Sequence, residues 1–100
     1  MLANVDLTST NTNFQIYQVP SGQTATVTIR FCNRTAGNVH VQLIFSSTNS
    51  PGNSNYAVYN AVIYPNDVYT EPGVVLNAGD YIFAQTDTLG VNTLVWGFSQ

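Results

Sequence analysis

The stretch TATVTIRFCNRTAGNVHVQLIF, residues 24–45, contains two alternating patterns separated by a polar connector. Every second residue from Ala25 to Phe31 is apolar, and the same alternation resumes from Val39 to Phe45. A period of two is typical of a strand with one buried face. Because residues 33–38 have the length of a hairpin connector, the two strands are predicted to be antiparallel neighbours.

The outward face of these strands is almost free of charge. Thr, Asn and Gln stand where a solitary soluble protein usually carries Lys and Glu. Charged residues make up 7% of the whole chain, against about a quarter in average globular domains. Uncharged polar groups lose less free energy than ions when they leave water. This face is therefore suited to lie against other proteins.

The composition also excludes some classes of function. With 44% hydrophobic residues the chain is expected to fold, and its apolar runs are too short for a membrane span. Only Arg30 and Arg34 are basic and the net charge is -3, so nucleic acid is not an expected partner. The single Cys32 fits a reducing compartment, and the lack of a visible secretory signal predicts that the chain folds where it is made.

Further segments with strand patterns are predicted at 14–19, 56–64, 68–71, 81–86 and 93–98. Pro72 and Gly73 are predicted to end the strand that begins at Val68, and the loop 46–55 is long enough to cross between sheets. No segment has sustained helical spacing. Seven to eight short strands predict an all-β chain, an antiparallel β-sandwich that is either jelly-roll-like or Ig-like.

We expect residues 13–100 to form a single β-sandwich domain and residues 1–12 to form a polar N-terminal arm, with a disordered tail as the alternative. Removal of the arm is expected to leave a folded domain. The predicted core consists of Phe14, Ile16, Val27, Ile29, Phe31, Val41, Leu43, Val62, Ile82, Leu94 and Trp96.

The sequence predicts no catalytic residue, no metal site and no cofactor. His40 is the only histidine, and it stands on the face opposite Val39 and Val41. Cys32 could approach His40 across the connector, but no third orienting group is visible. The acidic residues are scattered singly over turns, where carboxylates commonly accept backbone hydrogen bonds. We interpret the sequon at residues 33–35 as a turn.

Tyrosine is the commonest aromatic residue, and exposed tyrosines can contact proteins or stack on sugar rings. The candidates for sugar stacking are Tyr56, Tyr59, Tyr64, Tyr69 and Trp96. The predicted partner-binding residues are Leu2, Val5 and Leu7 in the arm, together with Tyr56, Tyr59 and Tyr69.

Two groups of motif residues resemble a group of small structural proteins of tailed bacteriophages. The first is a Tyr-x-Val-Pro-x-Gly turn at residues 17–22, followed by a Thr-rich strand that ends in Cys-Asn-Arg at residues 32–34. The second is Leu-x-Ala-Gly-Asp at residues 76–80, followed by an aromatic strand. The resemblance covers roughly residues 14–98.

This resemblance implies a non-enzymatic virion protein that is assembled in the cytoplasm of the host bacterium. The expected role is that of a capsid decoration or cement subunit, which stabilises the shell through contacts with the major capsid protein or other virion proteins. A homo-oligomer is also expected. The alternatives are a tail, neck or fibre component involved in host attachment, or a glycan-binding β-sandwich module.

Overall fold

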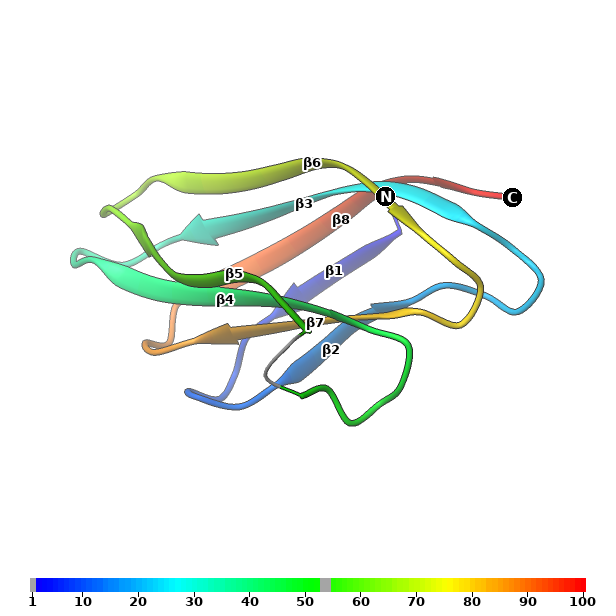
Figure 1. Cartoon of the computed structure of the whole chain (residues 1–100). Helices are drawn as coiled ribbons and strands as arrows, with labels where there is room; N and C mark the ends of the chain where they lie inside the picture. Colours follow the sequence, from blue (N-terminus) through cyan, green and yellow to red (C-terminus); the bar gives the residue numbers. More distant parts are fainter. Residues whose placement is uncertain (1, 53–54) are drawn as a thin grey trace.

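The computed structural model describes residues 2–52 and 55–100, and these residues form eight β-strands and no α-helix. The strands are β1 (Ala3–Asp6), β2 (Phe14–Gln18), β3 (Ala25–Asn33), β4 (Val39–Ser46), β5 (Tyr56–Ile63), β6 (Val68–Leu76), β7 (Tyr81–Thr86) and β8 (Val91–Ser99). They form two four-stranded sheets, sheet A in the order β1-β8-β3-β6 and sheet B in the order β2-β7-β4-β5 (Figure 1). All pairings are antiparallel. The predicted all-β sandwich is confirmed.

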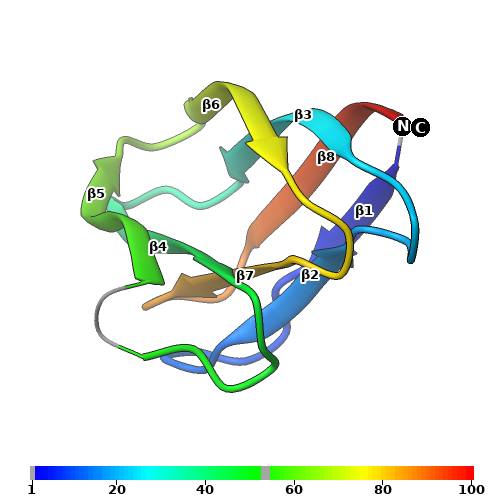
Figure 2. The ribbon, with the colours of Figure 1, turned by 45° about the vertical axis from the view of Figure 1, so that its right-hand side comes forward.

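The strand pairing identifies the sandwich as a jelly roll. β1 pairs with β8, β2 with β7, β3 with β6 and β4 with β5, so the second half of the chain runs back along the first. This double ribbon is rolled until β3 also meets β8 and β4 also meets β7. Figure 2 shows the resulting two layers. Eight strands in two sheets are the jelly-roll arrangement, whereas a constant-type Ig domain has seven.

The prediction that the two strands of residues 24–45 are neighbours is wrong. β3 lies in sheet A and β4 in sheet B, so the connector crosses from one sheet to the other. The predicted buried faces are nevertheless right, since Val27 and Val41 enter the same core from opposite sides. Alternation reports which face of a strand is buried but not which strand lies beside it. Because packed sheets are only about 10 Å apart, a short connector can span them.

Two other connections differ from the prediction. β6 does not end at Pro72 but continues through a bulge in which Pro72 and Gly73 stand opposite Thr28. Gly73 has a φ of 68°, which glycine adopts without strain, and Pro is tolerated because β6 is an edge strand. The loop 46–55 does not cross between sheets, because β5 pairs with β4. The turn at residues 64–67 makes the next crossing instead.

The core lies between the two sheets. The predicted core residues that are buried are Ile16, Val27, Ile29, Phe31, Val41, Leu43 and Ile82. The prediction is wrong for Val62, which is 43% exposed. Leu94 and Trp96 lie on the outer face of sheet A, because the register pairs them with Arg30 and Thr28. Phe14 is only partly buried and packs against the core.

The N-terminal segment is part of the domain, and this corrects the expected boundary between residues 12 and 13. β1 pairs with β8 along its whole length. Leu2 N–H donates to the Val95 carbonyl at 2.7 Å, and Leu7 N–H donates to the Val91 carbonyl at 3.0 Å. The Leu7 side chain is 2% exposed. Leu7 therefore belongs to the core, and the predicted partner-binding role for it is wrong.

Candidate interaction surface

Each of the four edge strands is irregular or short, which disfavours pairing with further strands. β2, β5 and β6 carry register shifts, and β1 is only 4 residues long. In β5 the bulge includes Asn60, which has a φ of 54°, a left-handed conformation that Asn tolerates. Bulges and short edge strands are devices that prevent edge-to-edge association. Contacts with partners are therefore expected through the faces of the sandwich.

We define the sheet A face as the outward side chains of the three strands β3, β6 and β8. Its members are Thr26, Thr28, Arg30, Cys32, Val68, Thr70, Val75, Asn92, Leu94, Trp96 and Phe98. Val75 is 70% exposed and Phe98 is 56% exposed, although both are large apolar residues. Arg30 is the one charged member. The sheet A face is thus an apolar and polar surface with a single cation.

Arg30 lies against the indole ring of Trp96. Its guanidinium carbon is 5.1 Å from the centroid of the ring, a cation–π geometry. The Nε atom of Arg30 is buried and has no hydrogen-bond partner within residues 2–52 and 55–100. Arg34, in contrast, forms an ion pair with Asp6 at 2.7 Å. Of the two arginines, Arg30 is therefore the one whose charge is not neutralised by a carboxylate of the described residues.

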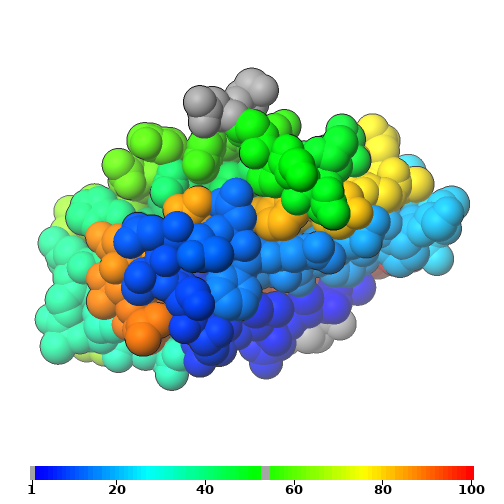
Figure 3. Space-filling model, turned by 90° about the horizontal axis from the view of Figure 1, so that it is seen from below, coloured from blue at the N-terminus to red at the C-terminus, as the bar shows by residue number. Residues whose placement is uncertain are grey.

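The middle of sheet B has a different outer surface. Ile44 is 1% exposed and Phe83 is 5% exposed, and both lie outside the main core cluster. Tyr81 stacks on Phe83 with 5.8 Å between ring centroids. The green segment after β4 lies against β7 on this side of the molecule (Figure 3). The apolar side chains at the centre of sheet B are therefore already covered by the chain itself.

The predicted tyrosines have unequal access to partners. Tyr59 is 67% exposed, and Tyr56 packs edge-on against it with 5.1 Å between ring centroids. Tyr69 is half-buried against Phe31, and its hydroxyl donates to the Glu71 carboxylate at 3.1 Å. Burial raises the pKa of Tyr69, and the hydrogen bond and negative charge of Glu71 raise it further. Tyr69 is thus part of the packing rather than a freely presented side chain.

The remaining predicted residues are Leu2, which precedes β1, and Val5, which lies in it. Leu2 and Val5 are partly buried and pack against the core. Sequence reasoning missed Val75 and Phe98, the two most exposed apolar side chains of the sheet A face. The sequence pattern could have identified Phe98, because the alternation of β8 places Leu94, Trp96 and Phe98 on one face. Assigning Leu94 and Trp96 to the core concealed it.

His40 and Cys32 are not brought together. Cys32 lies on the sheet A face beside Asn92, whereas His40 lies on the outer side of sheet B. The Nδ1 atom of His40 is 3.0 Å from the Asp87 carboxylate, and the backbone N–H of His40 donates to the same carboxylate. Partial burial raises the pKa of Asp87, but hydrogen bonds from His40 and Thr88 and the His40 charge outweigh it, so the net pKa is lowered.

Asn33 is buried at the end of β3 and ties three segments together. Its Nδ2 group lies 2.9–3.0 Å from the carbonyl oxygens of Gly37, Ile63 and Tyr64. Its Oδ1 atom accepts hydrogen bonds from the backbone N–H and the hydroxyl of Thr35. Asn33 is the last residue of β3 and is 0% exposed, so its side chain anchors the start of the connector 34–38 from inside the fold.

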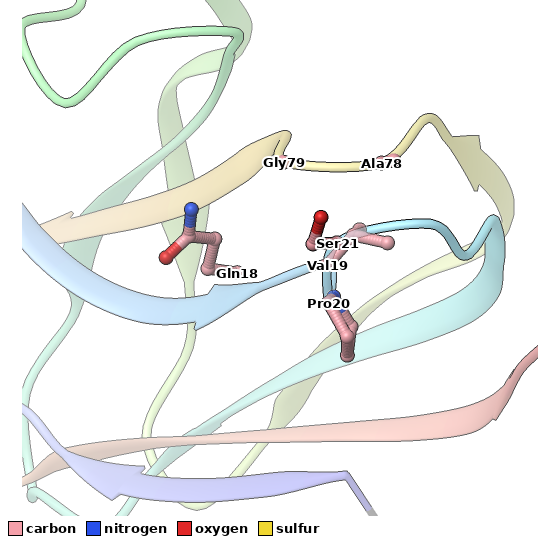
Figure 4. Close-up of a pocket in the computed structure, with 6 residues that line it drawn as sticks. All are labelled: Gln18, Val19, Pro20, Ser21, Ala78 and Gly79. Atoms are coloured by element: carbon pink, nitrogen blue, oxygen red, sulfur yellow. The ribbon is translucent and has the colours of Figure 1, made fainter.

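A pocket of 510 Å³ lies at the opposite end of the sandwich, where the turn after β2 meets the turn before β7 (Figure 4). It is lined by Gln18, Val19, Pro20, Ser21, Ala78 and Gly79. Val19 N–H donates to the Asp80 carbonyl at 2.9 Å, and Gly79 N–H donates to the Val19 carbonyl at 3.0 Å. The pocket lining contains no acid, base or thiol. These turn motifs therefore pair with each other.

Comparison with known proteins assigns no family. No family model matches this chain, and no curated protein or solved structure matches it significantly. Among residues 2–52 and 55–100, no three His, Cys, Asp or Glu side chains lie close enough to hold a metal ion. The same residues include no helix that could cross a membrane. Three large apolar side chains that are exposed in the described residues, Val68, Val75 and Phe98, belong to the sheet A face.

Proposed function

We propose that this chain is a non-enzymatic structural subunit of a tailed-phage virion, a decoration or cement protein that stabilises the capsid shell. The observation that carries the proposal is the sheet A face, where Val75 and Phe98 are exposed in a nearly uncharged setting. Exposed apolar patches mark sites of protein–protein contact. The expected partners are the major capsid protein or other virion proteins, and further copies of the chain.

The bulged or short edge strands support the same proposal. A subunit present in many copies must not polymerise through its sheets, and the bulges in β2, β5 and β6 oppose that. A surface rich in Thr, Asn and Gln can be buried at a lower desolvation cost than a charged one. Weak contacts at many equivalent sites on a shell add up through avidity.

The resemblance to phage structural proteins suggests the virion as the site of action. The fold is compatible with that role, since jelly rolls occur in capsid domains as well as in lectins. The test is cryo-electron microscopy of virions from the phage whose genome encodes this sequence. Density for a jelly roll at regular positions on the capsid lattice is the expected result. Density confined to the neck, tail or fibres would support the alternative of a host-attachment component. Absence of the chain from the particle would overturn the virion proposal.

A glycan-binding module is the second candidate, and the exposure of Tyr59 and Tyr64 favours it. Tyr59 lies on β5 of sheet B and Trp96 on β8 of sheet A, so they belong to different sheets. A sugar platform would therefore depend on the tyrosines of β5. A glycan array with wild-type protein and the Tyr59→Ala variant separates the candidates, because specific binding lost in this folded variant would favour glycan recognition.

A further inference from the structure

The Arg30 guanidinium is held in place but has no carboxylate partner in the described part of the chain. Its guanidinium carbon lies over the Trp96 indole ring on β8, 5.1 Å from the ring centroid. Among the described residues, Arg34 pairs with Asp6, and the His40 ring is hydrogen-bonded to Asp87. A planar guanidinium with free N–H groups binds a carboxylate with two parallel hydrogen bonds. Its most favourable external ligand is therefore an acidic group.

The surroundings of Arg30 are suited to a protein surface. Leu94 stands opposite Arg30 in the ladder between β3 and β8, and Trp96 and Phe98 follow on the same face. Val75 continues this apolar surface on β6, across Thr26 from Phe98. A partner that covers these side chains excludes water from the guanidinium, which strengthens an ion pair there. The ligand is thus an acidic side chain flanked by apolar ones.

The acidic side chains of this chain are already engaged. Asp6 pairs with Arg34, Glu71 accepts from Tyr69, and Asp87 accepts from His40. Asp67 accepts from the Val68 N–H, and Asp80 accepts from the Asn77 N–H. Packing two copies about an axis through Arg30 would also place like charges together. The complementary carboxylate is therefore expected on a different protein.

We propose that the sheet A face binds a protein partner that places an Asp or Glu carboxylate on Arg30 and apolar side chains on Trp96, Phe98 and Val75. This inference rests on the proposed function and adds the chemistry of the partner to it. Arg30 fixes the register of the contact, and the apolar residues around it supply most of the buried surface.

The first test uses the isolated chain and two capped peptides, acetyl-Leu-Glu-Phe-amide and acetyl-Leu-Gln-Phe-amide. In a ¹⁵N NMR titration, the Glu peptide is expected to shift the Arg30 Nε–H and Trp96 Nε1–H signals. Binding of the Gln peptide to the wild-type chain, and of the Glu peptide to the Arg30→Gln variant, is expected to be about tenfold weaker, since a charge-assisted hydrogen bond is lost. Arg34→Gln is the matched control and should bind as wild type does.

Equal responses to the two peptides, or unchanged binding by Arg30→Gln, would overturn the inference.

The second test treats virions and the free chain with phenylglyoxal, an arginine reagent, and reads the products by mass spectrometry. The sequence offers only two arginines and no lysine. Arg30 is expected to be protected in the particle while Arg34 stays reactive; equal reactivity of Arg30 in both states would contradict it. If the chain is missing from virions, the proposed function fails while the peptide result still decides the acidic site.

Discussion

At the scale of single residues, the buried Asn33 is the side chain on which most local hydrogen bonding depends. Asn33→Ala removes the donor shared by the carbonyls of Gly37, Ile63 and Tyr64. Since an unsatisfied buried polar group costs about 1–3 kcal/mol, we expect a loss of about 2–4 kcal/mol in the free energy of unfolding. Urea denaturation followed by circular dichroism measures it.

Asn33→Asp tests the direction of the same hydrogen bonds. It turns a donor into a carboxylate that faces three carbonyl oxygens, so it should be less stable than Asn33→Ala at pH 7 and recover partly on acidification. The exposed Asn38 of the same connector gives the control Asn38→Ala, which is expected to change stability by less than about 0.5 kcal/mol. A loss of that small size for Asn33→Ala would refute the structural role.

Asp87 is predicted to contribute to the acid dependence of stability. Its pKa is below the usual 3.8 in the folded protein, so the folded state binds its proton less readily than the unfolded state. The contribution is therefore present above pH 3.8 and is lost as the pH falls through the lower folded value. Asp87→Asn should melt with a smaller drop in Tm between pH 5 and pH 2 than wild type.

A direct measurement is the ¹³C NMR titration of the Asp87 carboxyl group in the wild-type protein. A midpoint at or above 3.8 would show that the hydrogen bonds from His40 and Thr88 do not outweigh the partial burial. The corresponding midpoint in an unfolded peptide gives the reference.

At the scale of elements, Gly97 allows β8 to run close beside β3. It pairs with Val27, has a φ of 138°, and a Cβ atom there would overlap the carbonyl oxygen of Thr26. Gly97→Ala must therefore displace backbone, and we expect a loss of about 2–4 kcal/mol in thermal or urea unfolding. Gly37→Ala is the control, because a Cβ atom at Gly37 meets nothing within 4 Å. Equal stability of the two variants would contradict the close approach of these strands.

At the scale of the whole molecule, β1 completes sheet A. Deleting residues 2–7 removes the ladder with β8 and the buried Leu7. A buried Leu alone stabilises by about 1.5–3 kcal/mol, and a domain of this size has about 5–15 kcal/mol in total. The deletion is expected to unfold the chain or lower its Tm by more than 10 °C, measured by circular dichroism.

The sequence-based expectation was the opposite, a folded domain without its arm, and an unchanged Tm would restore it. Leu7→Ala separates lost packing from lost backbone pairing, with an expected cost of about 2–4 kcal/mol. Leu89→Ala is the matched control, because Leu89 is 55% exposed and should contribute little.

The candidate surface shows how far prediction from sequence can reach. Alternation in β3 correctly identified Arg30 and Cys32 as outward residues. In β8 the largest aromatic residue was assigned to the core, whereas Thr93 and Val95 are the buried positions. The register of β8 against β3 places Thr93 beside Phe31 in the core and Trp96 on the outer face. Register depends on pairing with a strand that is distant in the sequence. The cation–π contact of Arg30 with Trp96 could therefore not be foreseen.

The sequence by itself determined the all-β class, the turn positions other than Pro72-Gly73, and the buried face of β3 and β4, because strand period and turn chemistry are local properties. Only the tertiary structure decided that β3 and β4 lie in different sheets, that β1 belongs to sheet A, and that the roll is closed by β3 with β8 and β4 with β7. The backbone groups of one strand can form hydrogen bonds with any other strand. The local sequence pattern therefore does not determine which strand a segment pairs with. The choice is made by burying all inward faces in one core at once.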